Sequence, residues 1–589
     1  MPEYLAPGVY VEETSFRAKS IEGVGTSTTA FVGPTRKGPY RVDEDTQVIP
    51  ELLTSYGDFE RIYGGLAELD LGDGVPATNF LAHAVRAFFN EGGSRLYVSR
   101  VVGTDAAPST VTVISSNTES DVVSFSARFP GACGDGSVRV REVQTPASAI
   151  TMSNSPEGTL LRTGATGPFN YHVKVDGAWR PAANPSQDPA SASTLESSQP
   201  AIITLLIIAE DADGQSMSYE NVGLANKHPR WIGHVLAAAP ARRSDHLQNL
   251  FSISIGATVS PAELRDGLLD GATANSAGQL ERVWTLVGGD DGGEPTTASY
   301  RLALMDIASL EDVSIVAAPG SSAYAVANND NPQAIANALI SHAESRRAYR
   351  IAVLDTPPGE LPSGARTYRS LFDSRYAALY YPWVVVSNPL ARPGRDAIPK
   401  EIDLPPSGFV CGIYARNDVQ RGVHKAPANE VVRGALRFAL NVNFDQQGML
   451  NPLGVNCLRF FSGRGYRVWG ARLASSDPEW KYVSDRRYFN YLEASIDRST
   501  QWAVFEPNGE RLWANVRQTI SDFLYNEWRN GALLGTTQEQ AFFVRCDRST
   551  MTQNDLDNGR LICLIGVAVL KPAEFVVFRI GQKTADARA

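Results

Sequence analysis

Close to its C-terminus the chain carries the stretch Lys-Pro-Ala-Glu-Phe-Val-Val-Phe-Arg-Ile-Gly, residues 571–581. Successive side chains of a strand point to opposite faces. Here both faces are largely apolar, with Val576, Phe578 and Ile580 on one and Phe575, Val577 and Arg579 on the other. Pro572 marks the start of the strand, because proline has no N–H to donate to a ladder. Since only the polar segment 582–589 follows, we expect that this strand can be laid into another subunit's sheet as easily as into its own.

A second short strand is predicted near the N-terminus, over Tyr4–Glu13, followed by residues 14–25, whose polar composition is typical of a tether. Glycine accommodates backbone rotation at little cost, so Gly23, Gly25 and Gly581 are predicted hinges. The predicted inter-subunit strand residues are Val9, Tyr10, Val11, Glu12, Glu574, Phe575, Val576, Val577, Phe578, Arg579 and Ile580.

Composition and charge exclude several classes of protein. The formal net charge is −10 and the sequence has no long basic run, which argues against nucleic-acid binding. The N-terminus carries an acid and two prolines where a signal peptide needs a basic and then an apolar region, and the apolar run 201–209 is too short to cross a bilayer. We therefore expect a soluble protein that is neither exported by a Sec-type route nor inserted in a membrane. The cysteines show no C-x-x-C pair and fit buried thiols in a reducing compartment; they are Cys133, Cys411, Cys457, Cys546 and Cys563.

The pattern of apolar and polar residues changes along the chain. Helical and strand patterns alternate before residue 103 and again from 284 to 389, whereas 103–235 has short β runs separated by polar loops. The predicted fold class is α/β (α+β) and multidomain, with a core domain of mixed sheet and flanking helices built from both chain ends, plus an inserted β-rich outer domain. The predicted parts are an arm and linker at 1–25, the first part of the core at 26–102, the insertion at 103–280, an α/β domain at 281–404, a C-terminal core domain at 405–570 and a C-terminal strand and arm at 571–589.

Two expectations of secondary structure are specific enough to test. Residues 428–439 carry apolar side chains at helical spacing, which predicts a helix. Residues 377–386 form a long apolar run, which predicts a single strand.

The sequence contains no Walker A motif, no H-E-x-x-H pair and no G-x-S-x-G elbow, and its seven histidines lie far apart. We expect no enzyme activity, no cofactor and no metal. An alternative keeps a carbohydrate-binding or hydrolytic role for the β-rich insertion, which would need a cleft with aromatic platforms. The insertion supplies few aromatic candidates, mainly Phe129, Tyr171, Trp179 and Trp231.

The C-terminal third resembles the contractile tail sheath proteins of phage tails and related injection machines. Many signals in fixed order carry the resemblance: Tyr466–Arg472, Trp480–Val483, Val504–Asn508, Gly531–Gly535, Ala541–Asp547 and Lys571–Val576. At the N-terminal end, Ala6–Glu13 and Thr29–Gly33 are similar to the opening of that family. Residues 103 to about 280 carry no motif of the family.

The resemblance implies a hexameric, helically stacked sheath whose subunits complete sheets in their neighbours with terminal arms. It also implies four kinds of partner: further copies of this chain, an inner tube protein, baseplate proteins, and tail terminator or cap proteins. Such a sheath is assembled in the bacterial cytoplasm and becomes part of a phage tail (virion) or an injection particle. The sequence leaves open which machine this is, although one chain of this size with both arms disfavours the type VI secretion sheath. It also leaves open the state of contraction, the trigger, a second sheath paralogue and the role of 103–280.

Overall fold

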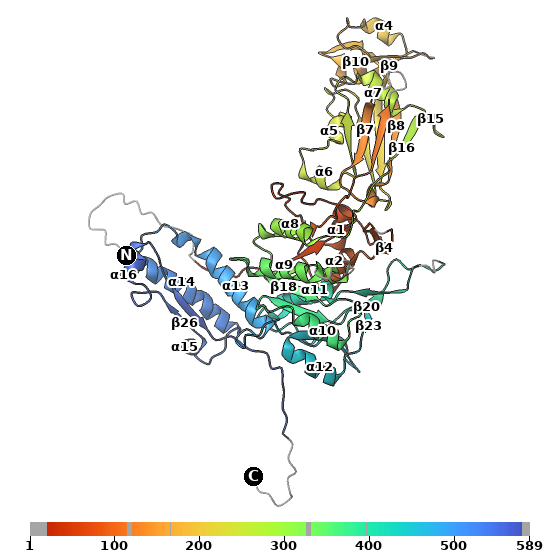
Figure 1. The fold of residues 1–589 in the computed structure, drawn as a ribbon. Helices are drawn as coiled ribbons and strands as arrows, with labels where there is room; N and C mark the ends of the chain where they lie inside the picture. Colours follow the sequence, from red (N-terminus) through yellow and green to blue (C-terminus); the bar gives the residue numbers. More distant parts are fainter. Residues whose placement is uncertain are drawn as a thin grey trace, which may run out of the picture.

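The computed structural model describes residues 20–72, 74–114, 121–164, 167–324, 331–394 and 398–579. Three parts follow one another in space (Figure 1): a β-rich unit at one end, a central sheet layered with helices, and a unit of long helices reaching sideways. The last described residues before the C-terminus lead away from the central part. The predicted fold class, a mixed α/β chain with an inserted β-rich unit, is confirmed.

A nine-stranded mixed sheet forms the central part, in the order β2-β5-β1-β17-β18-β19-β24-β25-β22. The strands from β5 to β24 run parallel. Parallel strands covered on both faces are apolar throughout, and β1, β18 and β19 are buried along their whole length. The strands are β2 (Leu52–Leu53), β5 (Leu96–Arg100), β1 (Thr29–Gly33), β17 (Ile315–Ala317), β18 (Ile351–Asp355), β19 (Ala377–Tyr381), β24 (Val455–Phe461), β25 (Gly465–Val468) and β22 (Glu430–Val431).

Helices cover both faces of this sheet. On one face α2 (Phe80–Glu91) packs beside α11 (Pro406–Arg421), and on the other lie α8 (Thr297–Ala308) and α9 (Asn331–Glu344). The first two helices approach so closely that a Cβ at Gly408 would lie 2.7 Å from the Cα of Ala84. The remaining helices of the central part are α1 (Tyr56–Tyr63), α10 (Pro362–Arg369) and α12 (Phe444–Leu450).

The outer unit is a sandwich of an eight-stranded and a three-stranded sheet around one apolar core. Strand β12 shows the expected alternation of buried and half-buried residues. The larger sheet ends with β16 at Thr285, so the β-rich unit passes the predicted boundary at 280. The strands are β6 (Thr110–Ile114), β7 (Asp121–Ala127), β8 (Ser137–Pro146), β9 (Leu160–Thr163), β10 (Asn170–Val175), β11 (Ala178–Pro181), β12 (Ala201–Glu210), β13 (Ser216–Val222), β14 (Phe251–Ile255), β15 (Thr273–Ala274) and β16 (Leu280–Thr285). The helices are α3 (Ala149–Asn154), α4 (Ala192–Glu196), α5 (Ile232–Val235), α6 (Arg243–Gln248) and α7 (Pro261–Leu268).

The chain enters and leaves the outer unit at one place. The amide of Gly293 donates to the carbonyl of Thr104 at 2.9 Å, next to the close approach of Gly103 and Gly293. Ion pairs join the turn between β12 and β13 to the loop after β1, with Arg36 Nη2 2.8 Å from Asp213 Oδ1 and Lys37 2.6 Å from Asp211.

The C-terminal unit is built on two long helices, α13 (Val483–Ser499) and α14 (Glu510–Arg529). The apolar face of α14 packs into a separate core, and Gly531, with φ +78°, follows its end as expected. The other elements are α15 (Gln538–Ala541), β26 (Phe542–Arg545), α16 (Gln553–Asp557) and β27 (Leu564–Val567).

Two predicted elements are wrong. Residues 428–439 contain the strands β22 and β23 (Ala435–Phe438) in place of a helix, with Gly434 between them at φ +73°. Residues 377–386 are divided by Pro382, which cannot donate to a ladder. Strand β19 therefore stays in the central sheet, while β20 (Val384–Ser387) pairs with β21 (Glu401–Leu404) and β23. A last pair joins β3 (Leu69–Asp70) and β4 (Pro76–Ala77).

The predicted terminal strands are only partly within the described residues. Val9, Tyr10, Val11 and Glu12 lie outside them, as do Ile580 and Gly581. Residues 571–579 are described and form no helix or strand within the protomer. No helix in the described part of the chain is long and apolar enough to span a membrane. Of the five cysteines, Cys563 is half-buried and the others are buried.

Candidate functional site at the roots of the terminal segments

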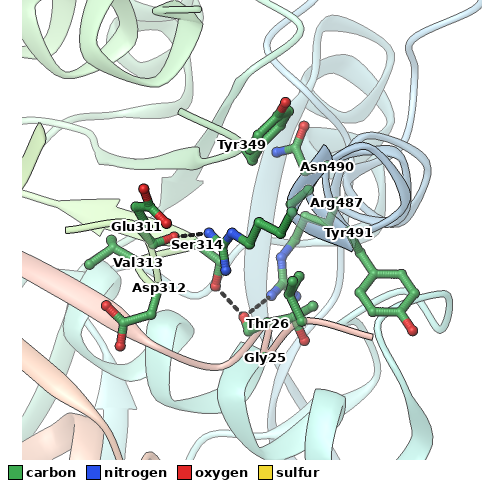
Figure 2. A pocket seen from close by; sticks show the side chains of 13 residues that line it. Gly25, Thr26, Glu311, Asp312, Val313, Ser314, Tyr349, Arg487, Asn490 and Tyr491 are labelled. Carbon is green, nitrogen blue, oxygen red and sulfur yellow. Dashed lines mark hydrogen bonds between the residues drawn. The ribbon is translucent and has the colours of Figure 1, made fainter. Parts of the chain in front are cut away.

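The N-terminal root, residues 20–28, lies against α13. The amide of Val24 donates to Ser495 Oγ at 3.1 Å. The carbonyl of Thr26 accepts from Arg487 at 3.0 Å and from the hydroxyl of Ser314, as Figure 2 shows. The root is thus fixed to the C-terminal unit and to the central part together.

A buried ion pair supports this root. Arg487 lies in two-point contact with Asp418, at 2.6 and 2.8 Å, and both side chains are 3% exposed. The Thr26 hydroxyl donates to the same carboxylate at 2.7 Å. Such two-point arginine–carboxylate contacts fix geometry as well as charge, so the position of residue 26 is set by side chains distant in sequence.

The predicted hinges Gly23 and Gly25 both lie in this root, but their surroundings differ. A Cβ at Gly23 would lie 2.2 Å from the hydroxyl oxygen of Tyr491, whereas nothing approaches within 4 Å of one at Gly25. Gly23 therefore serves close packing here, a role that the sequence did not predict. The hinge role of both glycines stays a prediction.

The C-terminal root is held by Glu574. Its carboxylate accepts hydrogen bonds from Arg472 at 2.6 and 2.8 Å, from Asn451 at 2.7 Å and from Tyr482 at 3.1 Å. Partial burial acts to raise the pKa of Glu574, but the hydrogen bonds from Arg472 and Asn451 outweigh it and hold that pKa below its usual value. Sequence reasoning placed Glu574 in a strand and missed this anchoring role, because its partners lie about a hundred residues away.

Beyond Glu574 the chain presents apolar side chains to solvent. Phe575, Val576, Val577 and Phe578 are 72%, 68%, 77% and 83% exposed. Within the described residues none of them pairs with a strand. A run of this kind has the composition of a strand that is paired on both sides, so it is well suited to addition to another sheet.

The C-terminal unit also offers sheet edges. Strands β26 and β27 pair with each other and, among the described residues, with no further strand. Phe543, Leu564 and Ile565 on this hairpin are 49%, 51% and 37% exposed. A strand edge presents unpaired N–H and C=O groups, so a two-stranded sheet with apolar surface and open edges is suited to receive added strands.

The described side chains at the roots form no cluster that could hold a metal ion. Among the residues that the structure describes, no group of three or more His, Cys, Asp or Glu side chains is placed to hold a metal ion. At each root a buried arginine binds a carboxylate, Arg487 with Asp418 and Arg472 with Glu574, and these contacts anchor the segment.

Two family models match the central and C-terminal parts of the chain. A family model described as phage tail sheath protein central domain matches residues 293–472, and one described as phage tail sheath C-terminal domain matches residues 475–583. A putative prophage major tail sheath protein of Pseudomonas aeruginosa (strain UCBPP-PA14) is 27% identical over 270 residues, which cover 45% of this chain. The chain spans 64% of the length of that curated relative.

Two solved structures share the fold over nearly the whole chain. One is the contracted sheath complex of an extracellular contractile injection system, PVC, with a TM-score of 0.52 at 21% sequence identity. The match covers 99% of this chain and 99% of that chain. The contracted helical sheath of the anti-feeding prophage has a TM-score of 0.52 at 20% identity, with 98% of this chain and 99% of that chain covered.

The fold is the one that these two sheath structures share. Residues 293–472 and 475–583 carry the central and C-terminal domains of the phage tail sheath family.

Proposed function

We propose that the chain is the structural subunit of a contractile sheath, which stacks as hexameric rings around an inner tube and contracts to drive the tube through a target envelope. The observation that carries the proposal is the C-terminal root, where Glu574 anchors a solvent-exposed apolar run beside a unit with open sheet edges. Residues 575–580 of one copy would then extend the β26–β27 sheet of the next, and residues 9–12 would do the same at the N-terminal end.

The partners follow from that role. They are further copies of the chain, an inner tube protein, baseplate proteins and a terminator or cap, with assembly in the bacterial cytoplasm before the sheath becomes part of a phage tail or injection particle. The similar PVC structure is a sheath complex in contracted state, which supports the proposal. The energy of contraction comes from the difference between two sets of interfaces, so the stroke needs no catalytic centre in this chain.

The alternative role of the outer unit in binding carbohydrate is less well supported. Trp179 is buried in a small cluster with Met152, Leu161 and Leu195. The ring of Tyr171 is covered by Arg265, whose guanidinium carbon lies 4.5 Å from the ring centroid. Packing within the unit therefore accounts for these aromatic side chains.

Truncation tests the proposal. The full chain and a variant lacking 571–589 are each produced with the tube protein and imaged by electron microscopy, with a variant lacking only 582–589 as the matched control. We expect striated hollow cylinders from the full chain and the control, and a folded protein without cylinders from the 571–589 deletion. Removal of 1–13 is expected to have the same effect. Long sheaths formed by either arm deletion would contradict the role of that arm.

A further inference from the structure

The turn between α13 and α14 presents an aromatic side chain to solvent. Phe505 is fully exposed, and Val504 beside it is 56% exposed. An exposed aromatic ring gains nothing from folding of the protomer, because its apolar surface stays in water. The ring is therefore available for burial against another molecule.

The backbone at Phe505 is also unfavourable for this residue type. Its φ is +66°, in the left-handed region where a Cβ comes close to the following carbonyl oxygen and where glycine is the usual occupant. The protomer thus carries a strained backbone and a hydrated ring at one position. Strain of this kind persists where surrounding structure imposes it and is concentrated at functional positions.

Hydrogen bonds fix the turn that carries Phe505. The amide of Val504 donates to the carbonyl of Gln501 at 3.2 Å. The amide oxygen of Asn508 accepts from the indole N–H of Trp513 at 2.7 Å, and its NH2 donates to the carbonyl of Arg560 at 3.1 Å. Because the turn is already fixed, binding through this side chain orders less of the chain, and pre-organisation of this kind favours affinity.

We propose that Phe505 is an inter-subunit anchor that inserts into an apolar site on a second copy of this chain. Arg560, to which Asn508 ties the turn, lies in the segment that leads into β27. The exposed ring and the open edges of the β26–β27 sheet therefore belong to one unit, the unit that the proposed function assigns to contacts between copies. The choice of a second copy as the partner of Phe505 therefore rests on the proposed sheath function.

Two variants separate the anchor from local stability. Phe505→Gly removes the ring and relieves the backbone, so the monomer should unfold at the same or a higher temperature, while the yield of sheaths with the tube protein falls at least tenfold. Gln199, at φ +51° in the outer unit, provides the matched control, since Gln199→Gly relieves backbone strain at an ordinary residue type and should leave the sheath yield unchanged. Sheath yield from Phe505→Gly equal to that of wild type would overturn the proposal.

Photocrosslinking identifies what covers the ring. Phe505 is replaced by the photoreactive analogue p-benzoylphenylalanine in the full chain, sheaths are assembled and irradiated, and crosslinked peptides are identified by mass spectrometry. A crosslink to a second copy is expected. Crosslinks confined to the tube protein or to the same copy would overturn the anchor while leaving the sheath function intact. Wild-type protein that forms no sheath with the tube protein would overturn both.

Discussion

Replacing Glu574 by glutamine tests how the C-terminal segment is anchored. The neutral side chain keeps the size of the carboxylate but presents an NH2 group to partners that are themselves donors, Arg472 and Asn451. Loss of one partner from a buried ion pair costs about 3–5 kcal/mol. Because the Glu574 side chain is 20% exposed and Arg472 keeps a 2.9 Å hydrogen bond to the carbonyl of Asn451, we expect a smaller cost, about 2 kcal/mol.

That free energy changes the population of the released segment. Since 1.4 kcal/mol is a factor of ten, Glu574→Gln should favour release by roughly 30-fold. Cleavage by elastase after Ala573 reports the open population when opening is fast relative to cleavage, so the cleavage rate should rise by roughly the same factor. Glu510→Gln, at an exposed position in the first turn of α14, is the control and should cleave like wild type. Equal cleavage rates for Glu574→Gln and wild type would refute the anchoring role.

The same anchor predicts a pH dependence. The pKa of Glu574 is lower in the folded protein than in the unfolded chain, so the folded state binds fewer protons in this range. Its stabilising contribution is present in full above the unfolded pKa of about 4.3 and is lost as the pH falls through the folded value. Cleavage of the released wild-type segment by pepsin, which is active at acid pH where elastase is not, should therefore speed up below about pH 4, and Glu574→Gln should show little of this change.

Three further predictions concern other positions. Asp418→Asn leaves the buried Arg487 without its charge partner and should destabilise the protein by about 3–5 kcal/mol, seen as a lower melting temperature of the C-terminal unit; an unchanged melting temperature would contradict the role of the pair. Gly23→Ala places a Cβ 2.2 Å from a tyrosine hydroxyl oxygen and should lower the stability of the protein by about 1–3 kcal/mol. Gly25→Ala meets no neighbour and should change the stability by less than about 0.5 kcal/mol. Equal effects of the two variants would show that the close packing at Gly23 is unimportant. Burial raises the pKa of Asp355 to about 7, so between about pH 4 and 7 the folded protein holds a proton that the unfolded chain has lost. The stability of the protein therefore falls as the pH rises through this range. Asp355→Asn should make the melting temperature nearly independent of pH there, and a pH dependence that persists in this variant would belong to other groups.

Sequence reasoning succeeded where one local pattern has one structural meaning. The alternation of helix and strand between residues 284 and 389 and the short β runs of 103–235 follow from periodicity and from polar turns, and both occur as predicted. It failed at 428–439, because apolar residues at helical spacing also suit two short strands joined by a glycine in the left-handed region.

The site was predicted less completely than the fold. An apolar run such as 575–578 is visible in sequence, and so is its fitness for a sheet. The clamps on Glu574 and Thr26 are not, because Arg472 and Arg487 become their neighbours only through the tertiary fold. Long-range ion pairs of this kind leave no local signal in a single sequence.

The place where the chain leaves the central part for the β-rich unit has a practical consequence. Thr104 and Gly293 are one hydrogen bond apart, so a foreign domain whose own ends lie close together could be spliced between them with short connectors. Such a graft would have to supply two acids in place of Asp211 and Asp213, or neutralise Arg36 and Lys37, since these cations would otherwise lose their counterions. This position is where new cargo could be displayed while the rest of the subunit keeps its shape.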